Sequence, residues 1–188
     1  MSTTKIRCAW CSDDPLYQDY HDHEWGVPEY DDRKLFEMLI LEGAQAGLSW
    51  ITILRKRENY RAAFDNFDPK KVARYDETKI AELMANDGIV RNRLKLESAV
   101  KNAKVFLDMQ KEFGSFSAWL WLHVNNTALR NSPASLKQVP AQTELSDKIA
   151  KSLKKRGMNF VGSTIIYAFL QATGVVNDHT RDCFRHGR

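Results

Sequence analysis

Cysteine and histidine, whose sulfur and nitrogen atoms coordinate soft metal ions, lie almost entirely near the two ends of the sequence. Seven of the eight residues of these types stand there, and His123 is the exception: Cys8, Cys11, His21, His23, His179, Cys183 and His186. Zinc prefers such donors, usually four of them in a tetrahedron. The distribution therefore predicts one metal site that ties the ends of the chain together.

The spacing of these residues leaves two ligand sets open. His179 and Cys183 are four residues apart, one turn of a helix, so both can face the same ion. Near the start, Cys8 and Cys11 would complete a site of three cysteines and one histidine. Alternatively, Cys8 and His21 would complete a site of two cysteines and two histidines, with Cys11 as a small buried residue. Either set has four protein ligands, which predicts a structural metal. The alternative is that these are scattered packing residues.

Aromatic side chains are unusually dense in the first thirty residues, where they alternate with carboxylates: Trp10, Tyr17, Tyr20, Trp25 and Tyr30. Aromatic faces beside carboxylates suit a flat, electron-poor ring, through stacking and cation–π attraction. The competing interpretation is an aromatic mini-core folded over the metal site.

Glu42 ends an apolar run, residues 39–41, and precedes the glycine-bearing stretch 43–47. A glutamate at such a place is often an exposed residue at a helix end. If it is buried, it needs a cationic or hydrogen-bonding partner, because an isolated buried charge is very costly. In an aromatic pocket, that partner could be a ligand.

Residues 86–91, Asn-Asp-Gly-Ile-Val-Arg, stand between two helical patterns. A tight glycine turn between antiparallel helices can grip a phosphate through backbone N–H groups at the start of the second helix. Arg91, Arg93 and Lys95 would reinforce such a contact. The pattern is weak evidence for a helix-hairpin-helix, because Val90 replaces the second glycine of the usual Gly-x-Gly turn.

The elements that must position these residues are helical throughout. Apolar residues recur at helical spacing after Asp31-Asp32, after the cap Ser49, over residues 80–84 and 96–107, and over 116–124, 145–153 and 164–173. Asp68-Pro69 predicts a short additional helix. No period-two alternation is sustained, and residues 125–142 predict an irregular connection. We therefore expect an all-α fold.

Composition narrows the class of protein. The chain has 188 residues, of which 43% are hydrophobic and 28% charged, the balance of a soluble globular protein. No apolar run is long enough to span a bilayer, and the first residues lack a signal-peptide core, so we expect a cytoplasmic protein without a membrane partner. The net charge is +4, and four basic clusters make a polyanionic partner plausible, although solvated helix faces would look alike.

Several segments resemble the 3-methyladenine DNA glycosylase I family, the constitutive alkylation-repair glycosylases of bacteria. The resemblance covers nearly the whole chain and rests on residues 14–17 (DPLY), 20–28 (YHDHEWGVP), 45–50 (QAGLSW), 56–60 (KRENY), 154–157 (KKRG), 160–162 (FVG) and 176–179 (VNDH). It implies a helix-hairpin-helix glycosylase fold with a zinc-binding segment built from both termini. The expected single unit spans residues 1–188, with a helical core at about 31–175 and the segments 1–30 and 176–188 joined at the zinc.

The resemblance also implies which residues form each site. The structural zinc would be held by Cys8, His21, His179 and Cys183, which decides against Cys11. The base pocket would consist of Glu42 with Trp10, Tyr17, Tyr20, Trp25 and Trp50. The hairpin would lie at the Gly88 turn, with Arg91 and Arg93, and the loop that fills the gap in the duplex would lie at Gly47 and Leu48.

The implied activity is base-excision repair of double-stranded DNA. A monomeric enzyme would flip cationic 3-methyladenine into the aromatic pocket, hydrolyse its N-glycosidic bond and leave an abasic site. Glu42 would select and hold the base. Related glycosylases usually place a catalytic aspartate after the hairpin, but no Asp or Glu occurs here between Gly88 and Glu97. This favours a monofunctional enzyme without lyase activity.

Two other functions account for part of the pattern. A non-catalytic module that binds damaged DNA would keep the basic hairpin and the aromatics but would give Glu42 no chemistry. A redox or metal sensor built on Cys8 and Cys11 would leave residues 45–50 unexplained.

Overall fold

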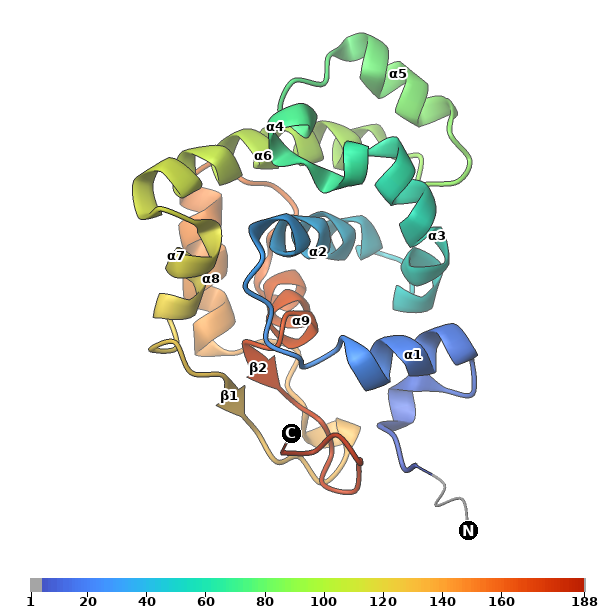
Figure 1. Cartoon of the computed structure of the whole chain (residues 1–188), viewed down its shortest axis with the longest axis vertical. Helices are drawn as coiled ribbons and strands as arrows, with labels where there is room; N and C mark the ends of the chain where they lie inside the picture. The colour runs from blue at the N-terminus through green and yellow to red at the C-terminus, as the bar shows by residue number, and fades with distance from the viewer. Residues whose placement is uncertain (1–4, 188) are drawn as a thin grey trace.

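The computed structural model of the protein describes residues 5–187, most of which lie in helices (Figure 1). Residues 1–4 and 188, at the outer edges of the two expected terminal segments, lie outside the described residues. The α-helices are α1 (Pro15–His23), α2 (Asp32–Gln45), α3 (Trp50–Ala63), α4 (Pro69–Val72), α5 (Glu77–Ala85), α6 (Arg93–Phe113), α7 (Phe116–Leu122), α8 (Glu144–Lys155) and α9 (Ser163–Ala172). Short 3-10 helices are η1 (Ala9–Cys11), η2 (Asp65–Phe67) and η3 (Leu136–Gln138).

The expectation of a helical protein is confirmed, with one small addition. Two strands of two residues each, β1 (Leu129–Arg130) and β2 (Val176–Asn177), pair in parallel. They are too short to produce a period-two pattern in the sequence. Within the described residues, no helix is long and apolar enough to cross a membrane.

Helix α2 lies at the centre of the molecule. It contacts α3, α6, α7 and α9, and every residue from Leu35 to Ala44 is buried. A helix surrounded on all sides must be apolar nearly all round, and the run at residues 38–41 meets that requirement. Glu42 belongs to the same buried stretch, so the central helix carries a carboxyl group into the interior.

Helix α1 was not expected from the sequence, because residues 13–24 are polar and lack an apolar stripe. Asp14 caps it by accepting hydrogen bonds from the backbone N–H groups of Leu16 and Tyr17, and Pro15 occupies the first helical position. The same Asp-Pro signal correctly predicted α4. Applied at residue 14, it would have predicted α1 as well.

The segment that follows α1 crosses the end of α9 in direct backbone contact. The backbone N–H of Gly26 donates to the carbonyl of Gln171, and that of Glu29 donates to the carbonyl of Thr173. Gly174 has a φ of +66°, and a Cβ atom at this position would lie 2.2 Å from the carbonyl carbon of Val27. Only glycine therefore permits this crossing.

We predict that Gly174→Ala destabilises the protein strongly, because the methyl group would separate two backbone segments that touch. Gly114→Ala is the matched control: its φ is +84°, but no atom of residues 5–187 lies within 4 Å of the added Cβ. The control should lose about 1 kcal/mol from positive φ alone and the test variant at least twice that. Thermal unfolding measures both, and equal losses would contradict the steric argument.

Candidate functional site

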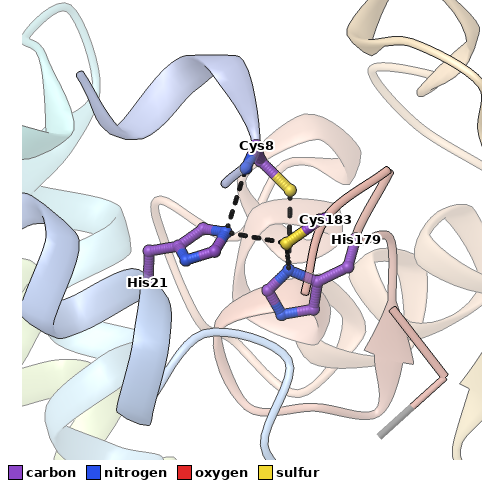
Figure 2. Close-up of side chains that lie close together, drawn as sticks. All are labelled: Cys8, His21, His179 and Cys183. Atoms are coloured by element: carbon purple, nitrogen blue, oxygen red, sulfur yellow. Dashed lines mark hydrogen bonds between the residues drawn. The ribbon is translucent and has the colours of Figure 1, made fainter. Parts of the chain in front are cut away.

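Four buried side chains from the two ends of the chain meet in one cluster, shown in Figure 2: Cys8, His21, His179 and Cys183. Their ligand atoms all lie within 4.8 Å of one another. The Sγ of Cys183 is 3.4 Å from Nε2 of His21 and 3.5 Å from Nδ1 of His179. A tetrahedral zinc with ordinary bond lengths places sulfur and nitrogen ligands about 3.5 Å apart. The four residues therefore have the donor types, burial and spacing of a metal site.

Neighbouring groups orient both imidazole rings of the cluster. Nδ1 of His21 lies 2.9 Å from a carboxylate oxygen of Asp22, and Nε2 of His179 lies 3.1 Å from the carbonyl oxygen of Trp25. Each ring thus donates its N–H outward and presents its other nitrogen to the cluster, where Nε2 of His21 also accepts a hydrogen bond from the backbone N–H of Cys8, at 3.2 Å. Burial lowers the pKa of both histidines, which favours the neutral form that a metal ligand requires.

Arg7 binds the carboxylate of Asp22, which orients His21. Its guanidinium donates to both carboxylate oxygens of Asp22, at 2.8 Å each. Burial acts to raise the pKa of Asp22, but hydrogen bonds from Arg7 and His21 outweigh it and lower the pKa to about 2. The carboxylate that orients His21 is therefore charged at neutral pH.

Cys11 is buried but lies outside the cluster. Its thiol donates to the carbonyl oxygen of Ser12 instead. The expectation that His179 and Cys183 lie on one helical turn is wrong, since residues 178–183 form an irregular segment and a turn. The turn still brings both donors to the same point.

The second site is an open cavity of about 300 Å³ between the N-terminal segment and the helical body. This volume is at the lower end of the range for small-molecule sites. All six residues expected in a base pocket line it: Trp10, Tyr17, Tyr20, Trp25, Glu42 and Trp50. They come from η1, α1, the loop after α1, α2 and the start of α3.

The cluster of two cysteines and two histidines lies directly behind two of these rings. The His21 ring is 5.3 Å from the Trp10 ring, centroid to centroid, and the His179 ring is 4.7 Å from the Trp25 ring. Trp10 and Trp25 in turn meet edge to face at 4.9 Å. The ligands of the cluster thus support one aromatic wall of the cavity.

Among the described residues that line the cavity, Glu42 is the only acidic one, and its carboxyl has no hydrogen-bond partner. The residue is 4% exposed, and within residues 5–187 no group donates a hydrogen bond to its carboxyl. Burial raises its pKa to about 8, so the carboxyl is largely protonated at neutral pH. The indole N–H groups of Trp10 and Trp50 are also buried without a partner. Unpaired buried polar groups are rare in folded proteins, and three around one cavity indicate a site for a flat, polar ligand.

The remaining residues around the cavity were not expected: Gln45, Leu136, Val139, Ala168 and Gln171. Gln171 donates through Nε2 to the buried carboxylate of Asp178, which also accepts hydrogen bonds from Asn131 and Tyr167. Gln171 lies near the end of α9, and no local pattern in the sequence marks it. It reaches the cavity only because α9 packs against α2.

The two segments expected to contact DNA are both accessible. Gly47, with a φ of +82°, turns the chain after α2, and the Leu48 side chain at the turn is 41% exposed. Residues 86–92 connect α5 to α6 and contact α3 through hydrogen bonds to Lys56, Asn59 and Tyr60. This arrangement holds the Gly88 turn against the helix that begins at Trp50.

The basic residues near this turn differ in their partners. Arg93 forms ion pairs with Glu77 and Glu97. Arg91 is exposed and, among the described residues, has no carboxylate partner. Of these two arginines, Arg91 is therefore the more available to an anion.

The chain is similar to proteins of one family over nearly its whole length. A family model described as methyladenine glycosylase matches residues 10–186. A DNA-3-methyladenine glycosylase of Haemophilus influenzae is 51% identical over 177 residues, covering 94% of this chain and 96% of the relative.

The chain is also similar to solved structures of such glycosylases. A crystal structure of a 3-methyladenine DNA glycosylase I, 52% identical, superposes with a TM-score of 0.94 over 96% of this chain and all of the other. A variant of a 3-methyladenine DNA glycosylase I in complex with 3-methyladenine, 38% identical, also superposes with a TM-score of 0.94, over 97% of this chain and 98% of the other. The chain therefore belongs to the methyladenine glycosylase family.

Proposed function

We propose that this protein is a monofunctional DNA glycosylase that excises 3-methyladenine from double-stranded DNA. The observation that carries the proposal is the unpaired carboxyl of Glu42 inside an aromatic cavity. The activity of the relatives supports it. In this proposal the whole chain acts as one monomeric unit.

The cavity suits a cationic base better than a neutral one. Methylation at N3 gives adenine a positive charge, and indole and phenol faces attract a cation more strongly than a neutral ring. An empty cavity favours the protonated form of Glu42, whereas an entering cation would pair with the carboxylate. Unmodified adenine brings no charge to offset the cost of the buried carboxylate, so the cavity discriminates between the two.

The bond that breaks is already weak, since the departing base takes the bonding electron pair and becomes neutral. Water adds its oxygen to the sugar carbon and releases a proton, and an abasic site remains. Glu42 and the rings hold the extruded base during this step, and stacking of about 1–3 kcal/mol per base repays the cost of extrusion. No lysine is among the residues that line the cavity, which favours hydrolysis over lyase chemistry.

We assign the DNA contacts to the two accessible segments. Helices α5 and α6 with residues 86–92 form the helix-hairpin-helix, whose turn binds a phosphate with Arg91, while Arg93 contributes once its surface ion pairs exchange for DNA. Leu48, carried by the Gly47 turn, fills the gap that the extruded base leaves.

We assign zinc to the cluster of Cys8, His21, His179 and Cys183, where all four positions are protein ligands. Zinc there would supply no chemistry to the reaction. It would fix the chain ends and, through His21 and His179, the aromatic wall of the cavity.

Replacing Glu42 tests the proposed function directly. Glu42→Gln keeps the shape but removes the negative charge, so release of 3-methyladenine from methylated duplex DNA should fall at least tenfold, while the fold stays intact. Glu58→Gln makes the same change on the exposed surface of α3 and should leave release unchanged. If the parent protein releases no 3-methyladenine, the proposed activity is wrong. If Glu42→Gln works as well as the parent, the role of the carboxylate is wrong.

The raised pKa of Glu42 predicts a pH-dependent cost in stability. Its folded pKa is about 8 and its ordinary value 4.5, so the folded protein binds the extra proton between these values and loses stability as the pH rises. Glu42→Gln should therefore match the parent near pH 5 and melt higher, by about 5 °C or more, near pH 9. Thermal melts at both pH values test this, with Glu58→Gln as control. A shift of equal size at pH 5 and pH 9 would refute the linkage.

The two buried cysteines near the N-terminus distinguish a structural metal from a redox pair. Cys8→Ser removes a proposed ligand, so the purified protein should lose most of its zinc and melt at least about 10 °C lower. Cys11→Ser changes a buried cysteine outside the cluster and should keep one zinc per chain. Metal analysis and melting temperature measure both, and loss of zinc from Cys11→Ser would instead support a Cys8–Cys11 site.

A further inference from the structure

Lys95 lies in a basic cluster of the sequence, but its ammonium group is directed toward protein and not toward solvent. Its Nζ donates to the carbonyl oxygens of Ala44, at 2.8 Å, and Ala46, at 2.6 Å. The side chain is half-buried, and burial lowers its pKa. Lys95 is thus bound to the C-terminal end of α2.

We propose that Lys95 is a positioning residue that holds the Gly47 turn and the Glu42 end of α2 at a fixed distance from the Gly88 hairpin. The inference rests on the proposed function, because it takes the turn and the hairpin to be the two DNA-contacting segments.

The physical basis is the unsatisfied end of a helix. The last carbonyl groups of a helix lack backbone partners and carry partial negative charge, so a lysine ammonium is a favourable cap. Here the chain leaves the helix at Ala46, and the turn is closed by a hydrogen bond from the Leu48 N–H to the Gln45 carbonyl. Lys95 binds the carbonyls on either side of Gln45. It therefore fixes the base of the turn that carries Leu48.

Lys95 is also held in place at its own helix, α6. Lys95 lies in the first turn of α6, which begins at Arg93 directly after the hairpin residues 86–92. Asn92 caps this helix by accepting a hydrogen bond from the Lys95 backbone N–H. The same residue thus belongs to the rigid start of α6 and to the end of α2, so the two DNA-contacting segments move together.

This link matters for extruding a base. The hairpin would hold a phosphate while Leu48 enters the duplex and Glu42 receives the base. A displacement of about 1 Å at such a site costs on the order of a hundredfold in rate. The free base, by contrast, needs only the cavity, so its affinity does not depend on the link.

The test compares Lys95→Met with Lys101→Met, an exposed lysine on the same helix whose replacement removes the same charge. Three quantities are measured in each variant: single-turnover release of 3-methyladenine from methylated duplex DNA, affinity for free 3-methyladenine, and hydrogen exchange of amides 44–49. In Lys95→Met, release should fall at least tenfold, free-base affinity should change less than twofold, and amides 44–49 should exchange faster. Lys101→Met should leave all three unchanged.

Other outcomes would overturn the proposal. Unchanged release, or an equal loss of release and of free-base affinity, would show that Lys95 does not couple the segments. A direct phosphate contact would lower the salt dependence of DNA binding by about 0.9 in log–log slope without changing exchange. If Lys95→Met fails to fold, Lys95→Gln, which retains a donor for one carbonyl, should fold and give intermediate release, and parental release would refute the inference. Should the parent release no 3-methyladenine, the proposed function fails, while the exchange measurement still tests the link.

Discussion

The unpaired carboxyl of Glu42 in an aromatic cavity is energetically costly, and much of the structure serves to keep it buried there. Burial of the apolar residues of α2 offsets this cost, because it holds the whole helix, and Glu42 with it, in the interior. The unpaired indole N–H groups of Trp10 and Trp50 add to the cost. Proteins commonly give up stability at binding sites in this way, because the ligand later satisfies the groups that the fold leaves unpaired.

Two parts of the chain form the walls of the cavity. The helical body supplies Glu42 and Trp50, whereas the N-terminal segment supplies the other aromatic side chains of the cavity. These parts are joined by the cluster of Cys8, His21, His179 and Cys183 and by the crossing of residue 27 over Gly174. Because the rings of His21 and His179 pack against Trp10 and Trp25, the geometry of the cluster is transmitted to the cavity through van der Waals contact. A metal held by these four residues would therefore act on the cavity through the aromatic rings, without contacting what binds there.

The sequence predicted the helical class and the candidate residues better than it predicted their arrangement. Cysteine and histidine are rare enough that their positions alone indicate a metal site. Spacing could not choose between Cys11 and His21, because that choice depends on α1, whose polar sequence lacks an apolar stripe. Gln171 was missed because it reaches the cavity only through the packing of α9 on α2. The sequence did not distinguish Lys95 from its basic neighbours, because its partners are backbone carbonyl groups, which every residue carries.

The cluster of two cysteines and two histidines also joins residues that are very far apart in the sequence. Cys8 and His179 are 171 positions apart, so their contact is among the most non-local in the molecule. Forming such a contact requires closure of a very long loop, which local helices cannot accelerate. The wall formed by Trp10 and Trp25 gains its support only when residues 179–183 arrive. Completion of the cavity therefore depends on contacts of longer range along the chain than those that pack the helical body.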